Sequence, residues 1–326
     1  MIQDRFGRVH NYLRISLTDK CNLRCFYCMP DEKYDFTPAA NLMQTEELAR
    51  LAQIFVAEGV TKIRLTGGEP LVRKDAGKII EHLSELPVEL VMTTNATRIH
   101  EHIDTLRASK ISTLNISLDT LQPEKFLLVT RRDLFHRVRS NIELLLHYGF
   151  NVKINVVVMK GFNENEINDF ILWTKFVPIQ VRLIEFMPFS GNRWTSNQVF
   201  SMHDICLEIA KQFEFLPVEN EVHDTAKHFM IPGHVGSFAI ISTMSAPFCD
   251  TCNRMRLTAD GKLKNCLFSE GETDLLKALR NNENVETLIH ESIRSKAKQL
   301  GGQFSGTFEM LDAAKIHNRP MITIGG

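Results

Sequence analysis

The chain has 326 residues with 38 Lys and Arg against 39 Asp and Glu, a formal net charge of −1, and 44% of its residues are hydrophobic. This composition excludes a largely disordered chain, and the charge argues against a protein that coats nucleic acid or an acidic membrane. The length suits one large α/β barrel or two smaller domains. We find no apolar run of about 18 residues that would span a membrane, and no secretory signal at the N-terminus.

Strand-like and helix-like segments alternate over roughly the first 190 residues. Short strands rich in Val, Ile and Leu are expected at 12–18, 62–66, 89–93, 113–118, 152–158 and 181–186. Helices are expected after Thr45 and at 76–83, 99–108, 134–147 and 164–174. This alternation predicts a parallel sheet with right-handed crossovers. Six units are fewer than the eight of a closed barrel, so we expect an α/β fold, either a partial (β/α)6 TIM-like barrel or a doubly wound sheet.

The alternation stops after Met187. A helix is expected at 199–213, a turn at 259–261, and helical structure at 273–300. We place a boundary near Met187, with residues 1–187 forming the barrel and residues 188–326 forming a C-terminal region.

The seven cysteines are too few, and odd in number, for a disulfide scaffold. We therefore expect a reducing, cytoplasmic compartment, where grouped cysteines indicate a metal site. Cys21, Cys25 and Cys28 read C-x3-C-x2-C directly after the first strand. Three thiolates can bind three irons of a four-iron cluster and leave the fourth open to a ligand. A zinc knuckle with three Cys and one His is the alternative, although no His lies in this loop.

The second expected strand ends in Gly67-Gly68-Glu69-Pro70. Paired glycines let the backbone approach a ligand closely, and the Glu69 carboxylate can accept a hydrogen bond from an ammonium group. An ordinary turn is the alternative. Polar or otherwise special residues also end the other strands, among them Thr93, Ser117, Asp119, Lys160 and Met187. Because chemistry in barrel-like folds gathers at the carboxyl ends of the strands, we expect these residues around one site.

A second group, Cys249, Cys252 and Cys266, reads C-x2-C-x13-C without an adjacent fourth ligand. This spacing favours a second iron–sulfur cluster with an open iron, and a zinc site is the alternative. Arg254 and Arg256 follow directly and point to the same side of an extended segment. Two guanidinium groups so placed suit a phosphate-bearing ligand, whereas a solvated basic strand is the alternative. Cys206 lies alone in an apolar stretch and is expected in the core.

The first cysteine loop and the Gly-Gly-Glu-Pro element together resemble the signature of the radical S-adenosylmethionine (SAM) superfamily. The second cysteine group, the segments 14–18, 62–64 and 182–188, and the terminal Gly325-Gly326 are similar to the GTP 3′,8-cyclase family within it. This resemblance extends over essentially the whole chain.

The resemblance implies two [4Fe–4S] clusters on the two cysteine groups, with SAM bound at the first and GTP at the second. The positions that match the SAM site or its neighbourhood are Tyr27, Gly67, Gly68, Glu69, Ser117, Asp119 and Met187. The positions that match the GTP site are Arg14, Lys62, Arg64, Thr93, Lys160, Arg182, Asn253, Arg254 and Arg256. Among these, Lys160, Arg254 and Arg256 are the candidate catalytic residues.

The implied activity is that of a SAM-dependent lyase that converts GTP to (8S)-3′,8-cyclo-7,8-dihydroguanosine 5′-triphosphate, the first step of molybdenum cofactor biosynthesis. The implied partners are cyclic pyranopterin monophosphate synthase and a reductant protein. No nucleic-acid or membrane partner is expected, and a homodimer is left open. Gly325 and Gly326 are expected to reach into the active site beside Arg254 and Arg256. The alternatives are a peptide-modifying radical SAM enzyme with an auxiliary cluster and a non-enzymatic zinc or electron-transfer protein.

One position departs from the family pattern. Ala96 follows Thr93-Thr94-Asn95, where family members commonly have Gly. If the backbone needs a positive φ there, the methyl group of Ala96 introduces strain.

Overall fold

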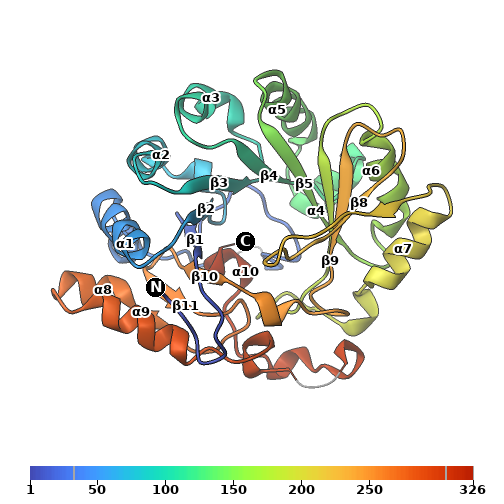
Figure 1. Ribbon diagram of the computed structural model, residues 1–326. Helices are drawn as coiled ribbons and strands as arrows, with labels where there is room; N and C mark the ends of the chain where they lie inside the picture. Colours follow the sequence, from blue (N-terminus) through green and yellow to red (C-terminus); the bar gives the residue numbers. More distant parts are fainter. Residues whose placement is uncertain (32–33, 305–306, 326) are drawn as a thin grey trace.

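The computed structural model describes residues 1–31, 34–304 and 307–325. Its centre is a curved run of six parallel strands that pair in sequence order (Figure 1). They are β1 (Tyr12–Ser16), β2 (Lys62–Thr66), β3 (Glu89–Thr94), β4 (Thr113–Ser117), β5 (Asn151–Val158) and β6 (Gln180–Glu185). The helices that connect them cover the outside of the sheet and are α1 (Thr45–Ala57), α2 (Ala76–Ser84), α3 (Ile99–Ala108), α4 (Pro123–Thr130), α5 (Phe135–His147) and α6 (Ile167–Trp173). The predicted partial (β/α)6 barrel is therefore confirmed.

The barrel strands bury one face against the helices and turn the other toward the interior. In β5 the buried side chains are the alternating β-branched ones, Val152, Ile154, Val156 and Val158. Because successive side chains of a strand point to opposite faces, Lys153 and Asn155 face the interior. The interior of the barrel is thus lined by the more polar half of its strands, and it can accept a polar ligand.

The C-terminal region adds strands to both edges of the barrel sheet. On one edge, β9 (Ser237–Ile241) pairs in parallel with β6, and β8 (Lys227–Met230) and β7 (Leu216–Pro217) continue antiparallel. On the other edge, β10 (Arg254–Leu257) pairs in parallel with β1, followed by antiparallel β11 (Lys262–Lys264) and β12 (Thr273–Asp274). One sheet therefore runs across the boundary that we expected near Met187.

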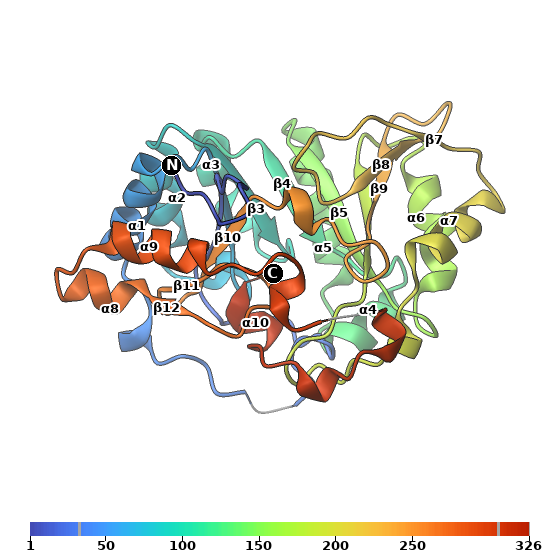
Figure 2. The same ribbon diagram turned by 60° about the horizontal axis from the view of Figure 1, so that its bottom comes forward.

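Four further helices complete the described chain, namely α7 (Met202–Ala210), α8 (Leu275–Arg280), α9 (Val285–Arg294) and α10 (Met321–Ile324). Helix α9 packs against α1, whereas α10 and the C-terminus lie near the middle of the barrel (Figure 1 and Figure 2). None of the described helices has both the length and the apolar character required to cross a membrane.

The expected helices and strands match the structure closely up to β6, with two exceptions. Helix α4 was not expected, although its first residue, Pro123, is a common helix-starting signal. The helix expected at 164–174 begins as a 3-10 turn, Glu164–Glu166, and becomes α-helical at Ile167. Farther along, the helical stretch expected at 273–300 divides into β12, α8 and α9.

Candidate active site

The loop after β1 brings three cysteines to the carboxyl end of the barrel strands. Cys21, Cys25 and Cys28 line one cavity of about 200 Å³, which we call the first Cys cavity. Its walls include seven further residues that we singled out from the sequence, namely Tyr27, Gly67, Gly68, Thr93, Ser117, Asp119 and Met187. The structure thus gathers the ends of the barrel strands around the first cysteine group.

Burial dominates the electrostatics of these three thiols. Burial, followed by the nearby Glu69 carboxyl group, raises the pKa of Cys21 to about 11. The pKa values of Cys25 and Cys28 are raised further, first by burial and then by the neighbouring cysteines. Thiolates in such a cavity need a positive charge to stabilise them, and a metal cluster supplies one.

The arrangement of the thiols fits an iron–sulfur cluster. All seven cysteines are free thiols. Within residues 1–31, 34–304 and 307–325, no three His, Cys, Asp or Glu side chains converge as the ligands of a single metal ion would. The thiolates of a cluster bind separate irons and stand farther apart than the ligands of one ion. Three thiols that surround one cavity match this requirement.

The glycines after β2 let this segment lie against the cysteine loop. A Cβ atom on Gly67 would lie 2.7 Å from the Thr18 carbonyl oxygen, and one on Gly68 would lie 2.5 Å from that of Lys20. The Gly68 amide donates to Thr18 at 2.6 Å. Any other residue would push the two segments apart, so the paired glycines are required by close packing as well as by access for a ligand.

Glu69 is placed differently from our expectation. Its carboxyl group is fully buried, accepts hydrogen bonds from Thr94 Oγ1 at 2.7 Å and from the Asn95 amide at 2.6 Å, and does not line the cavity. Burial raises its pKa to about 7. Glu69 therefore braces the end of β3 instead of presenting a free acceptor to a ligand. Ala96, just beyond, has φ of +59°, so the anticipated left-handed backbone is present at an alanine.

Tyr27 and Asp119 form a buried pair in the wall of the first Cys cavity. The Tyr27 hydroxyl group donates to Asp119 Oδ2 at 2.6 Å, and the Val157 amide donates to Oδ1 at 2.9 Å. Burial raises the pKa of Asp119 to about 6, although the hydrogen bond from Tyr27 opposes this effect. This cavity therefore contains a carboxyl group but no lysine or arginine in its lining.

The second cysteine group lines an adjoining cavity of about 190 Å³, which we call the second Cys cavity. Cys249, Cys252 and Cys266 reach it from the 3-10 turn Cys249–Thr251 and from the segment after β11. Five residues line both cavities, namely Thr93, Asn155, Ile184, Met187 and Met321. The two cysteine groups therefore face one another across a shared wall.

Arginines from three strands converge on the second Cys cavity. Its lining includes Arg14 of β1, Arg182 of β6, and Arg254 and Arg256 of β10. Burial and then a neighbouring arginine lower the pKa of Arg182 and of Arg256 to about 10, so both remain cationic at neutral pH. No carboxylate in the described part of the chain forms an ion pair with Arg64, Arg182, Arg254 or Arg256. These four arginines can therefore bind an anionic ligand.

Two asparagines of the interior also lack partners. Asn115 Oδ1 and Asn155 Oδ1 are buried, and neither has a hydrogen-bond partner among the described residues. Both residues line the second Cys cavity. Buried acceptors are normally satisfied, so these two oxygens are suited to accept hydrogen bonds from donors on a bound ligand. Neither asparagine was predicted from the sequence.

Four residues assigned to the GTP site do not line either cavity, namely Lys62, Arg64, Lys160 and Asn253. Arg64 is buried in the barrel interior, close to Arg182, whereas the other three lie elsewhere. Lys62, at the start of β2, forms an ion pair with Glu89 at 2.9 Å. Lys160 is exposed after the end of β5. The Asn253 side chain donates to Asn11 Oδ1 at 2.8 Å. These placements differ from the sequence-based expectation. Lys62 lies at the start of its strand, Lys160 lies beyond the end of its strand, and Asn253 directly precedes β10 and is held by Asn11.

Lys153 is the interior lysine of β5 that the sequence analysis missed. Burial, followed by Arg182 and Arg64, lowers the pKa of Lys153, which places its ammonium group among the interior arginines. The two-residue period of β5 supplied the signal, since Lys153 shares its face with Asn155. Lys153, and not Lys160, therefore contributes to the basic interior.

A buried polar chain leads from the N-terminal segment to Cys252. Asp4 Oδ2 lies 3.1 Å from His10 Nε2, and Lys296 Nζ lies 3.4 Å from His10 Nδ1 and 3.5 Å from Cys252 Sγ. Since a lysine ammonium group only donates, we assign the His10 hydrogen to Nε2. Burial, followed by Lys296, lowers the pKa of His10 to about 4. Burial raises the pKa of Cys252, but Arg254 and Lys296 lower it by more, to about 6.

The C-terminal tail reaches the active site, as expected for Gly325. Its carbonyl oxygen accepts a hydrogen bond from Arg256 Nη1 at 2.6 Å. Gly325 has φ of +85°, and a Cβ atom there would lie 2.6 Å from Thr66 Oγ1. Glycine is therefore required at this position. Gly326 lies outside the described residues.

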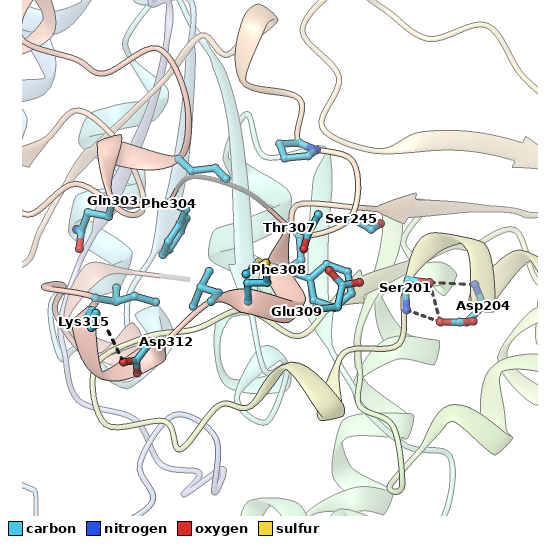
Figure 3. A pocket seen from close by; sticks show the side chains of 16 residues that line it. Ser201, Asp204, Ser245, Gln303, Phe304, Thr307, Phe308, Glu309, Asp312 and Lys315 are labelled. Atoms are coloured by element: carbon cyan, nitrogen blue, oxygen red, sulfur yellow. Dashed lines mark hydrogen bonds and ion pairs between the residues drawn. The ribbon is translucent and has the colours of Figure 1, made fainter.

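A larger cavity, of about 590 Å³, adjoins the second Cys cavity at Leu300 (Figure 3 shows the larger cavity). It is bounded by Ser201 and Asp204 and by side chains such as Phe304, Phe308 and Asp312. It contains none of the cysteines and none of the interior arginines. Composition, and not size, therefore identifies the site in this molecule.

Comparisons with known proteins agree with this geometry. Residues 15–174 match the family model described as Radical SAM superfamily, and residues 179–301 match that of Molybdenum Cofactor Synthesis C. The chain is 46% identical to the mitochondrial GTP 3′,8-cyclase of Arabidopsis thaliana, covering 100% of this chain and 84% of the relative. It is 39% identical to GTP 3′,8-cyclase of Thermodesulfovibrio yellowstonii, covering 100% of both. This chain belongs to the GTP 3′,8-cyclase family.

Members of this family differ in length. The chain is 44% identical to molybdenum cofactor biosynthesis protein 1 of Homo sapiens and spans 51% of that relative. Among solved structures, Streptococcus suis SuiB bound to S-adenosylmethionine has a TM-score of 0.61 at 16% identity, covering 89% of this chain and 69% of that chain. This likeness supports the radical SAM fold alone. The family resemblance and the fold class drawn from the sequence are both confirmed.

Proposed function

We propose that this GTP 3′,8-cyclase family member converts GTP to (8S)-3′,8-cyclo-7,8-dihydroguanosine 5′-triphosphate, as a lyase acting in the first step of molybdenum cofactor biosynthesis. The names of relatives that match the whole chain support this activity. The observation that carries the proposal is the junction of two cysteine-lined cavities, of which only the second is lined by arginines.

The first Cys cavity is the proposed site of a [4Fe–4S] cluster and SAM. Cys21, Cys25 and Cys28 would hold the cluster. When bound, the cluster and SAM supply one-electron chemistry that removes a hydrogen atom from the ribose. The Asp119 carboxyl group, held by Tyr27, provides an acceptor for the hydroxyl and ammonium groups of SAM.

The second Cys cavity is the proposed site of GTP. Arg182, Arg254 and Arg256 would bind the triphosphate through charge-assisted hydrogen bonds, with Lys153 and Arg64 adding charge from below. Asn115 Oδ1 and Asn155 Oδ1 would accept hydrogen bonds from donors on the base or the ribose. Cys249, Cys252 and Cys266 would hold a second cluster, which would supply an open iron to which the base could bind.

The shared wall positions the two ligands. Thr93 and Asn155 line both cavities and can orient the ribose between them. Met187 and Met321 also line both cavities, and their side chains exclude water from the place where the ribose would meet SAM. The chain's own contribution to the reaction is therefore the alignment and desolvation of the two ligands.

The partners of the reaction extend the proposal. A protein reductant would supply the electrons, and cyclic pyranopterin monophosphate synthase would consume the product. A homodimer and a cytoplasmic location stay predictions.

The test is an anaerobic incubation of iron-replete protein with SAM, a reductant and GTP deuterated at ribose C3′. We expect the label to appear in 5′-deoxyadenosine, together with formation of the cyclised nucleotide. Deoxyadenosine formation without transfer of the label contradicts the proposal, and stimulation by a peptide in place of GTP would favour a peptide-modifying enzyme. Metal analysis should give about eight irons per chain for two four-iron clusters, whereas zinc without iron contradicts both radical assignments.

A further inference from the structure

The C-terminal tail is held at a point before its glycines. Arg319 directly precedes Pro320, the N-cap of α10, and places its guanidinium group between two carboxylates. Nη1 and Nη2 donate to the two oxygens of Asp260 at 2.9 Å each. Nη2 and Nε lie 2.6 Å from the two oxygens of Glu272. We call Arg319, Asp260 and Glu272 the carboxylate latch.

The geometry of the latch distinguishes it from an ordinary surface ion pair. The planar guanidinium fork meets both carboxylates in a bidentate manner, the strongest arrangement available to arginine. The side chain of Arg319 is 21% exposed, that of Asp260 18% and that of Glu272 17%. Solvent therefore screens these charges less than it screens a surface ion pair. Burial lowers the pKa of Arg319, but Asp260 and Glu272 raise it by more. Lys264, itself buried, lies 3.4 Å from Glu272 and helps to balance the second carboxylate.

The carboxylates of the latch belong to the part of the sheet that builds the second Cys cavity. Asp260 lies in the turn between β10 and β11, and Glu272 directly precedes β12. Strand β10 carries Arg254 and Arg256, and Cys266 follows β11. The latch therefore ties the tail to the same strands that present the arginines and the third thiol.

Beyond the latch, α10 extends into the site. Met321 lines both Cys cavities, and Ile322 and Ile324 are buried. At the far end, Arg256 donates to the Gly325 carbonyl oxygen. A helix of four residues is too short to persist without external contacts, so its position depends on what holds its two ends.

We propose that the carboxylate latch is the positioning element that keeps α10 inside the barrel, with Met321 between the two cavities and Gly325 against Arg256. Loss of the latch releases the tail, opens the shared wall to water and leaves Arg256 without its contact to Gly325. The catalytic part of this inference rests on the proposed function, whereas the structural part does not.

The structural part is tested by hydrogen exchange and mass spectrometry on the full chain without SAM or GTP. Arg319→Ala should increase the exchange rate of the amides of residues 321–325 about tenfold, and Asp260→Asn should act in the same direction. Arg280→Ala is the matched control, because Arg280 makes a similar two-point contact with Glu47, at 2.6 and 3.0 Å, far along the chain from the tail. Unchanged tail exchange in both latch variants overturns the proposal.

The catalytic part is tested by GTP-dependent formation of 5′-deoxyadenosine in the same variants at matched iron content. We expect kcat to fall about tenfold in Arg319→Ala and to recover partly in Arg319→Lys, which keeps the charge but loses the fork. Arg280→Ala should keep its kcat. Faster tail exchange with unchanged kcat overturns the positioning role. If the parent chain itself forms no GTP-derived product, the proposed function fails, and the exchange comparison still decides whether the latch holds the tail.

Discussion

The two cysteine groups contain the same number of thiols but differ in the charged side chains around them. Around the first Cys cavity, burial and nearby carboxyl groups raise the pKa of Cys21 and Cys28. Around the second, Arg254 and Lys296 lower the pKa of Cys252 to about 6 in spite of its burial, whereas burial raises the pKa of Cys249. The lining of the first cavity includes Asp119 and no lysine or arginine, whereas four arginines line the second.

This contrast indicates that the surroundings, and not the thiols, select the ligand. SAM carries a sulfonium and an ammonium group, which suit a cavity with a carboxyl group. GTP carries a triphosphate, which suits converging guanidinium groups. Similar three-thiol groups thereby serve two different proposed ligands within one barrel.

The largest expected effect comes from removing one thiol of each group. Cys25→Ser should reduce SAM cleavage to background, because the first cluster is lost. Cys252→Ser should abolish formation of the cyclised nucleotide but leave cleavage of SAM by a strong reductant, since the first cavity is untouched. Chromatography of 5′-deoxyadenosine and of the nucleotide product from one anaerobic incubation measures both. Metal analysis of Cys252→Ser should give about four irons per chain, which shows that the first cluster is still present. If SAM cleavage is nevertheless lost in both variants, the two cysteine groups do not have the separate roles proposed for them.

The next effect concerns the arginines of the second cavity. Arg182→Met should raise the KM for GTP by about 10- to 100-fold, the value of one or two hydrogen bonds to a charged group. The same variant should resist urea better than the parent in the absence of GTP, because a buried, uncompensated charge has been removed. Arg107→Met, which removes an exposed arginine of α3, is the control and should change neither property. A lower resistance to urea in Arg182→Met than in the parent would contradict the mutual repulsion inferred for the interior arginines.

A smaller effect is expected from the thiols themselves in iron-free, reduced protein. At pH 7.5 Cys252 is mostly thiolate and Cys21 mostly thiol, given pKa values of about 6 and about 11. After the lower nucleophilicity of a low-pKa thiolate is taken into account, iodoacetamide should modify Cys252 about tenfold faster. The rate at Cys252 should be about half-maximal near pH 6 and level above pH 7, whereas that at Cys21 should rise throughout the alkaline range. Peptide mapping reads both rates, and Lys296→Met should slow the modification of Cys252 alone.

The smallest effect concerns the backbone beside the first cysteine group. Ala96→Gly relieves left-handed strain of about 1–2 kcal/mol. Glycine also makes the unfolded chain more flexible, which opposes folding by about 0.4–1 kcal/mol. The net result should be a variant that is more stable by about 0.5 kcal/mol. Ala52→Gly, within the α1 helix, is the control and should lose about 1 kcal/mol. Chemical denaturation measures both, and destabilisation of Ala96→Gly would show that the buried methyl group outweighs the strain.

Local patterns predicted most of what surrounds the first cavity. The C-x3-C-x2-C loop, the paired glycines and the two-residue period of the strands are all read over a few positions. The condition set for strain at Ala96, a positive φ, came from the family resemblance and not from a local pattern, and the structure meets it. Interior charge was harder to predict, because Lys160 lies beyond the end of β5 and is exposed, whereas Lys153 lies within the strand on the interior face.

Contacts between distant segments could not be predicted. His10 and Lys296 meet beside Cys252 although 286 positions separate them in the sequence. The partners of Arg319 lie 59 and 47 positions away. Glu69 is a further case, since the residues that hydrogen-bond to its buried carboxyl group, Thr94 and Asn95, lie 25 and 26 positions away. Such residues acquire their function only after the sheet has closed.

The pairing of β10 with β1 and of β9 with β6 has a consequence for how the chain is made. During synthesis the six central strands are made before β9 and β10, so both edges of their sheet are open. The strand that pairs with the outer edge of β1, β10, is translated more than two hundred residues later. Open strand edges are templates for aggregation, and long-range pairing forms slowly. The first three thiols are therefore synthesised before the strands that complete both edges of the sheet.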